Sequence, residues 1–115
     1  MPYLLLIVEP FGQRQARGPE AGHEVYDRML DYARSLKSRG VLVGTNSLKE
    51  EGARLTVRGG KRTVVDGPFT EAKELVGGYF LVDVRTFDEA LALAGECPAA
   101  EWAAVEVRET GPCYE

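Results

Sequence analysis

The chain has few of the residues on which common metal and redox sites depend. Its 115 residues include two cysteines, Cys97 and Cys113, and one histidine, His23. The cysteines form no CxxC pair and have no metal-ligand spacing, so we expect two free thiols rather than a disulfide. With a single histidine and no ligand-like cluster, the sequence predicts no zinc site, no other metal and no bound cofactor.

Excess positive charge and long hydrophobic runs are also lacking. Lys and Arg number 14 against 18 Asp and Glu, giving a net charge of −4, and the basic residues are scattered among acidic ones. Proteins that bind nucleic acids or anionic membranes usually present a basic face, so we expect neither as a partner. The apolar run at residues 3–8 is too short for a membrane span or a signal-peptide core. The expected location is therefore the cytoplasm.

What is present in the first half is a succession of strand and helix patterns that fits a single domain over residues 1–115. Residues 3–8 are continuously apolar, which is typical of a strand buried on both faces, and a loop rich in Gly and Pro follows up to Pro19. From about residue 20 to Gly40, apolar residues at helical spacing predict an amphipathic helix, namely Val25, Met29, Ala33 and Leu36.

The second half repeats the pattern after an insertion. Residues 41–44 begin a second strand, and residues 55–65 predict a hairpin with a two-residue turn at Gly59-Gly60. Residues 79–84 predict a further apolar strand. Thr86 and Glu89 match a capping box at the start of a second helix, which Pro98 ends. Residues 102–108 alternate between apolar and polar side chains and predict a last strand.

The order strand, helix, strand, hairpin, strand, helix, strand predicts an α+β fold of ferredoxin-like type, βαβ–hairpin–βαβ. In that topology the first strand and the strand after the hairpin occupy the centre of the sheet. The helices cover only one face of the sheet, so the apolar residues of the other face need a cover. That cover is either a second copy of the chain, packed sheet to sheet, or the hairpin folded over the face.

The segment Asp66-Gly67-Pro68-Phe69 stands where the hairpin ends. Gly and Pro restrict the backbone there, so we expect Asp66 and the nearby Glu71 to be held in place, as acid–base or ligand-orienting carboxylates are. Each residue also has a structural interpretation. Asp66 could accept backbone N–H groups in an Asx-type turn, Phe69 could belong to the core, and Glu71 could lie in a solvated turn with Lys73 as counter-charge.

His23 is the natural acid–base candidate because the unperturbed pKa of histidine lies near neutrality. On the first turn of a helix it could equally be exposed and without a role. Arg14 and Arg17, in the loop after the first strand, either close over an anionic ligand or stay solvated. Gly77-Gly78 predicts a bulge or a close backbone approach before a buried strand.

Three segments together resemble the DGPF-type members of the YCII-related family, small bacterial proteins of largely unknown function: residues 64–74, Gly77-Gly78-Tyr79-Phe80 and residues 105–108. The resemblance spans essentially the whole chain. It implies a homodimer assembled as a dimeric α/β barrel, with a pocket between the sheets and the hairpin. Some family members place a histidine and an aspartate in a pocket, which suggests His23 and Asp66 as the pair here. DGPF-type proteins are also associated with extracytoplasmic-function sigma factors.

Two functions remain open on this basis. The chain is either an enzyme acting on a small molecule or a non-catalytic module that senses a ligand or binds a protein, with a link to sigma-factor regulation. For the enzyme, His23 and Asp66 are the candidate catalytic pair, and the candidate ligand contacts are Arg17, Phe69 and Glu71. A His23 side chain within hydrogen-bond reach of an acid would favour the enzyme, whereas a His23 side chain in solvent would favour the module.

Overall fold

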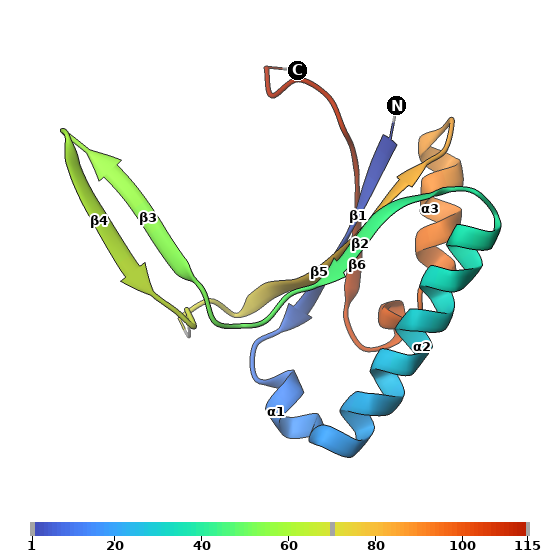
Figure 1. Cartoon of the computed structure of the whole chain (residues 1–115), viewed down its shortest axis with the longest axis horizontal. Helices are drawn as coiled ribbons and strands as arrows, with labels where there is room; N and C mark the ends of the chain where they lie inside the picture. Colours follow the sequence, from blue (N-terminus) through green and yellow to red (C-terminus); the bar gives the residue numbers. More distant parts are fainter. Residues whose placement is uncertain (1, 70, 115) are drawn as a thin grey trace.

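The computed structural model describes residues 2–69 and 71–114, so Thr70 of the segment after Asp66 lies outside the described residues (Figure 1). Four strands form one antiparallel sheet in the order β2-β5-β1-β6. They are β1 (Pro2–Pro10), β2 (Leu42–Ser47), β5 (Glu74–Asp83) and β6 (Ala104–Glu109). The two central strands are those predicted from their apolar runs. The fold is α+β and is compatible with the ferredoxin-like type.

Helices α2 (Pro19–Ser38) and α3 (Phe87–Glu96), with the 3₁₀ turn η1 (Pro98–Glu101), lie on the same side of the sheet (Figure 1). The segment predicted as a loop after β1 instead contains a short helix, α1 (Gln13–Arg17). Tertiary contacts favour it, because the Gln13 side chain donates a hydrogen bond of 2.5 Å to the backbone oxygen of Trp102. Among the described residues, no helix is long and apolar enough to cross a bilayer.

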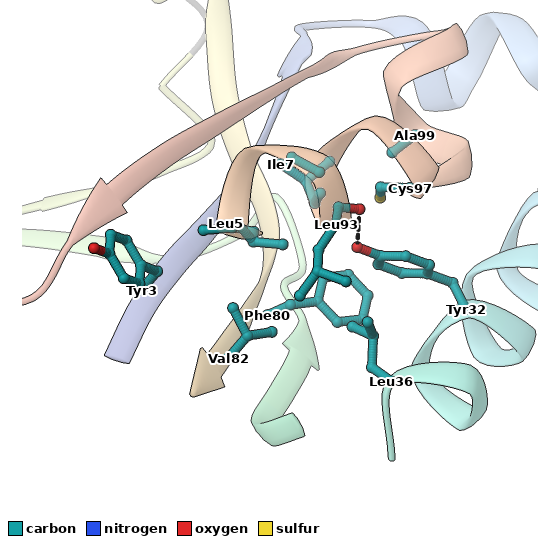
Figure 2. Packing of buried hydrophobic residues seen from close by; sticks show 12 residues of the cluster. Tyr3, Leu5, Ile7, Tyr32, Leu36, Phe80, Val82, Leu93, Cys97 and Ala99 are labelled. Atoms are coloured by element: carbon teal, nitrogen blue, oxygen red, sulfur yellow. Dashed lines mark hydrogen bonds between the residues drawn. The ribbon is translucent and has the colours of Figure 1, made fainter. Parts of the chain in front are cut away.

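The core lies between the helices and the sheet (Figure 2). Alternate residues of β1 point into it, which produces the period-two burial of Tyr3, Leu5 and Ile7. Tyr32 of α2 packs edge-on against the Phe80 ring of β5, with 5.0 Å between the ring centres. Its hydroxyl donates a 2.5 Å hydrogen bond to the backbone oxygen of Leu93 in α3. This contact ties the two helices together across the core.

Of the two hydrogen bonds of the capping box predicted for the second helix, the one to Thr86 is confirmed and the one to Glu89 comes from a neighbouring donor. The Thr86 hydroxyl accepts a hydrogen bond of 3.1 Å from the backbone N–H of Glu89. The Glu89 carboxylate accepts a 3.0 Å hydrogen bond from the backbone N–H of Arg85, one residue before the expected donor. Two backbone donors at this helix start are therefore satisfied by side chains.

The predicted hairpin is formed by β3 (Ala53–Arg58) and β4 (Lys61–Asp66), which we call the arm. Its turn is Gly59-Gly60, as predicted, and both residues have positive φ, +58° and +77°, which glycine adopts without strain. The arm forms its own two-stranded sheet and projects away from the four-stranded sheet (Figure 1). The alternative in which the hairpin folds back over its own sheet is therefore wrong. The sheet face opposite the helices, here called the open face, is not covered by the arm.

Candidate functional site

The buried face of β1 ends in a carboxylate. The alternation that buries Tyr3, Leu5 and Ile7 continues by two residues to Glu9, which is only 6% exposed. A carboxylate in that position needs a partner, because an isolated buried charge is strongly unfavourable. The partner is Arg14 of α1, whose Nη2 lies 2.5 Å from Glu9 Oε1. The sheet and the short helix are thus joined by a largely buried ion pair.

Arg14 is held by more than the carboxylate. Its Nε lies 3.1 and 3.2 Å from the two Glu9 oxygens, Nη1 donates to the backbone oxygen of Leu48 at 2.8 Å, and Nη2 also donates to that of Gly77 at 3.3 Å. The hydrogen bond to Glu9 raises the pKa of the Arg14 guanidinium. All three nitrogens of the side chain therefore donate to protein acceptors, and Arg14 joins α1 to β1, to β5 and to the segment after β2.

Two glycines make room for this arrangement. A Cβ on Gly77 would overlap Glu9 Oε1 and would lie 2.7 Å from Glu9 Cδ and 2.8 Å from Arg14 Nη2. A Cβ on Gly78 would lie 2.9 Å from the backbone oxygen of Asn46. The pairing register of β1 and β5 also shifts between Ile7 and the next residue, beside these glycines. The prediction of a bulge or close approach at Gly77-Gly78 is confirmed, and at Gly77 the close neighbour is a side-chain ion pair.

A cavity of about 680 Å³ lies beside the ion pair, between α2 and the helix-covered face of the sheet. Its size is within the range of sites for small molecules. Apolar side chains from the sheet and from α2 contribute to its wall, among them Ile7, Phe80, Val25, Met29 and Ala33. Glu9, Arg14, Arg17 and Thr45 add polar groups. The cavity could therefore hold a molecule with an apolar body and a polar end.

Arg17 is the cation of this cavity with the most unused donors. Its Nη2 donates to the Gln13 side chain at 3.1 Å, and its guanidinium lies 5.7 Å from the ring centre of Trp102. In the described part of the chain, its Nε and Nη1 donate to no protein acceptor. Arg28 also lies over the Trp102 ring, at 5.3 Å, but its guanidinium pairs with Glu101. Of the arginines lining the cavity, Arg17 is thus better placed than Arg14 to bind an anion.

The other candidate residues lie outside this cavity. His23 is exposed on α2 and Asp66 is exposed at the end of β4, and no hydrogen bond joins either side chain to another described residue. Glu71 is exposed as well. Phe69 contributes to a second, smaller recess of about 220 Å³, where the arm meets β5. There the Arg54 guanidinium lies 4.1 Å from the Phe69 ring centre. Of the five candidates, only Arg17 lines the larger cavity.

Sequence reasoning missed Glu9 and took Arg14 for either a lid residue or a solvated one. The signal for Glu9 was present, because it continues the period-two pattern of the buried face of β1. Its pairing with Arg14 depends on α1, which the Gly- and Pro-rich composition did not predict. The two cysteines are free as expected, Cys97 buried and Cys113 exposed. The described residues contain no group of three or more His, Cys, Asp or Glu arranged to hold a metal ion.

Comparison with known protein families finds one described domain over nearly the whole chain. The model of the YCII-related domain matches residues 1–112. No curated protein matches the chain.

Proposed function

This chain belongs to the YCII-related domain family, and we propose that it binds a small molecule with an apolar body and an anionic group in the cavity between α2 and the sheet. The observation that carries the proposal is the cavity itself, about 680 Å³ in volume and bounded by apolar side chains next to a buried ion pair. The apolar body would lie against Phe80, Met29 and Ala33. Its anionic group would bind Arg17.

The anion preference follows from how the two arginines are used. Arg14 already neutralises Glu9 and donates from all three nitrogens to protein acceptors. Arg17 keeps donors for a ligand, and a charge-assisted hydrogen bond to a charged group contributes about 1.5–3 kcal/mol. Removing the Arg17 guanidinium should therefore weaken binding of a matching anion by roughly ten- to a hundredfold.

The test is a thermal-shift screen of aromatic and medium-chain carboxylates, each paired with its uncharged amide. Carboxylates should raise the melting temperature of the wild-type chain more than their amides do. Arg17→Met should reduce this difference, and Ala33→Phe, which fills the cavity without changing any charge, should abolish binding. Arg34→Met is the matched control, because Arg34 lies on α2 but pairs with Asp31 on the exposed surface. If no compound stabilises the wild type, or if Ala33→Phe binds as well, the cavity is not a ligand site.

Of the two functions left open by the sequence, the exposed position of His23 supports the non-catalytic ligand-sensing module. Catalysis by His23 and Asp66, with Phe69 and Glu71 as ligand contacts, is our second proposal. It requires a ligand or a second copy of the chain to bring these side chains together. Turnover of a bound compound that is lost in both His23→Ala and Asp66→Ala would support it; unchanged turnover in both variants would reject it.

We further propose that the chain is a cytoplasmic homodimer of the dimeric α/β barrel type, of the DGPF subgroup, with a sigma-factor regulatory system as its setting. The uncovered apolar open face supports the dimer, and the sequence motifs support the subgroup. Sedimentation velocity tests the dimer. Capture of an extracytoplasmic-function sigma factor by the tagged protein, with and without a stabilising carboxylate, tests the regulatory link.

A further inference from the structure

The ion pair with Arg14 leaves part of the Glu9 carboxylate unused. All the hydrogen bonds that this carboxylate accepts from described residues come from Arg14. Oε1 accepts two of them, from Nη2 at 2.5 Å and from Nε at 3.1 Å. Oε2 accepts one, at 3.2 Å, from the Nε that it shares with Oε1. A carboxylate has about four acceptor sites, so Oε2 can accept a further hydrogen bond.

The free capacity of Oε2 is available to a ligand more than to bulk water. Glu9 is only 6% exposed and contributes to the wall of the cavity between α2 and the sheet. A buried acceptor gains more from a donor than an acceptor in water does, because the low dielectric strengthens the hydrogen bond. Arg14 already neutralises the charge of Glu9. A neutral hydroxyl therefore suits Oε2 better than a second cation or an anion does.

The rest of the cavity wall offers weaker acceptors. Within the described chain, Glu9 is the only carboxylate in this wall. The Thr45 hydroxyl donates to the backbone oxygen of Tyr79 at 2.8 Å, so it can accept only through a neutral oxygen. Hydrogen bonds to a charged acceptor are roughly twice as strong as those to a neutral one. A ligand hydroxyl in this cavity should therefore donate to Glu9.

The distance between Glu9 and the anion site depends on α1. Arg14 and Arg17 lie three residues apart on this helix, so their Cβ atoms are about 5–6 Å apart on one side of it. Arg14 holds Glu9, and Arg17 is the proposed anion contact. A hydroxyl at Glu9 and a carboxylate at Arg17 would therefore be close together in the ligand, separated by only a few bonds. The rest of the ligand would extend into the apolar part of the cavity.

We propose that the ligand of this cavity is a hydroxy acid whose carboxylate binds Arg17 and whose nearby hydroxyl donates to Glu9 Oε2. The inference rests on the proposed binding of an apolar anion, and it assigns to Glu9 the selection among such anions. The arrangement disfavours two other classes of acid. A plain carboxylate leaves Oε2 without a donor, and a dicarboxylate brings a second anion against it.

Isothermal titration calorimetry of the full chain with octanoate and its derivatives tests this ligand class. The better-bound enantiomer of β-hydroxyoctanoate should bind about ten- to a hundredfold more tightly than octanoate, because a hydrogen bond to a charged group contributes that much. β-Methoxyoctanoate keeps the oxygen but has no proton to donate, and ω-hydroxyoctanoate carries its hydroxyl at the far end of the chain, against the apolar wall. Neither should bind more tightly than octanoate.

Glu9→Gln tests the role of the carboxylate. Because Arg14 requires an acceptor, the amide oxygen should face Arg14 and the NH2 group should take the place of Oε2. The preference for β-hydroxyoctanoate over octanoate should then largely disappear. This preference is a ratio measured on protein that circular dichroism shows to be folded, so a lower stability of the variant does not change it. Glu50→Gln is the matched control, because Glu50 accepts from Gln15 and lies outside the cavity wall; it should keep the full preference.

The possible results separate this inference from the proposed function. Equal binding of octanoate and β-hydroxyoctanoate by the wild type would overturn the inference alone, and binding of none of the acids would overturn both. A preference that Glu9→Gln retains, or that Thr45→Val alone removes, would place the hydroxyl elsewhere and overturn the role of Glu9. Should Glu9→Gln not fold, the wild type still decides, because β-methoxyoctanoate binding as tightly as β-hydroxyoctanoate would show that no proton is donated.

Discussion

The close approach of Gly77 to the Glu9–Arg14 pair predicts a large effect from a single methyl group. A Cβ at position 77 would overlap a carboxylate oxygen of Glu9, so Gly77→Ala must displace one or both partners. Breaking a fully buried ion pair costs roughly 3–5 kcal/mol. Since the Arg14 side chain keeps 33% exposure and regains some solvation, we expect Gly77→Ala to lower the free energy of unfolding by about 2–3 kcal/mol.

The assay is urea and thermal unfolding monitored by circular dichroism. For a domain of 115 residues, each kcal/mol shifts the melting temperature by about 4 °C, so a fall of about 8–12 °C is expected. Gly95→Ala is the matched control. Gly95 lies in the last turn of α3, where a Cβ meets nothing within 4 Å, so the same substitution should stabilise by about 0.5–1 kcal/mol.

A double-mutant cycle assigns the effect to the ion pair. In a Glu9→Ala background the Glu9 carboxylate is absent, so the alanine methyl group at position 77 can occupy the space where the carboxylate would lie. Gly77→Ala should then cost less than about 1 kcal/mol, giving a coupling of roughly 1–2 kcal/mol or more between the two sites. Equal costs in both backgrounds would refute the steric reasoning, as would a Gly77→Ala variant as stable as the wild type.

Three further predictions follow from local contacts. A thiol reagent at pH 8 should label only Cys113 in the folded protein and both cysteines after denaturation. The reason is that burial raises the pKa of Cys97 and excludes the reagent. Rapid labelling of two thiols in the native state would contradict this. Burial also raises the pKa of Tyr32 above its usual value of 10.0, with smaller contributions from Cys97 and Glu96. The neutral phenol therefore contributes its full stabilisation below pH 10, and this contribution is lost as the pH rises above 10. Between pH 9 and 11 the free energy of unfolding should fall more for the wild type than for Tyr32→Phe, and equal falls would argue against burial of the phenol. Thr86→Ala should cost about 1 kcal/mol in urea unfolding, since it removes the hydroxyl that accepts from Glu89 N–H, whereas Thr86→Ser should cost little.

Much of the local structure was predictable because it depends on near neighbours in the chain. The Gly59-Gly60 turn follows from the positive φ that a tight hairpin requires, and the cap of α3 follows from the spacing of Thr86 and Glu89. The short helix α1 was not predictable in this way. Its glycine and proline neighbours indicate a loop, and it is held in place by Gln13 and Arg14 binding residues that are distant in sequence.

The sequence by itself determined the order of strands and helices and the central position of β1 and β5, whereas burial of β1 on both faces was predicted and only its alternate residues are fully buried. These depend on periodicity, which is written in consecutive residues. Only the tertiary structure decided where the candidate site lies. It joined Glu9 to Arg14 against Gly77, placed the cavity under α2 with Arg17 in its wall but neither His23 nor Asp66, and directed the arm away from its own sheet. Those outcomes depend on how close residues far apart in the chain come to one another, and no local pattern encodes such distances.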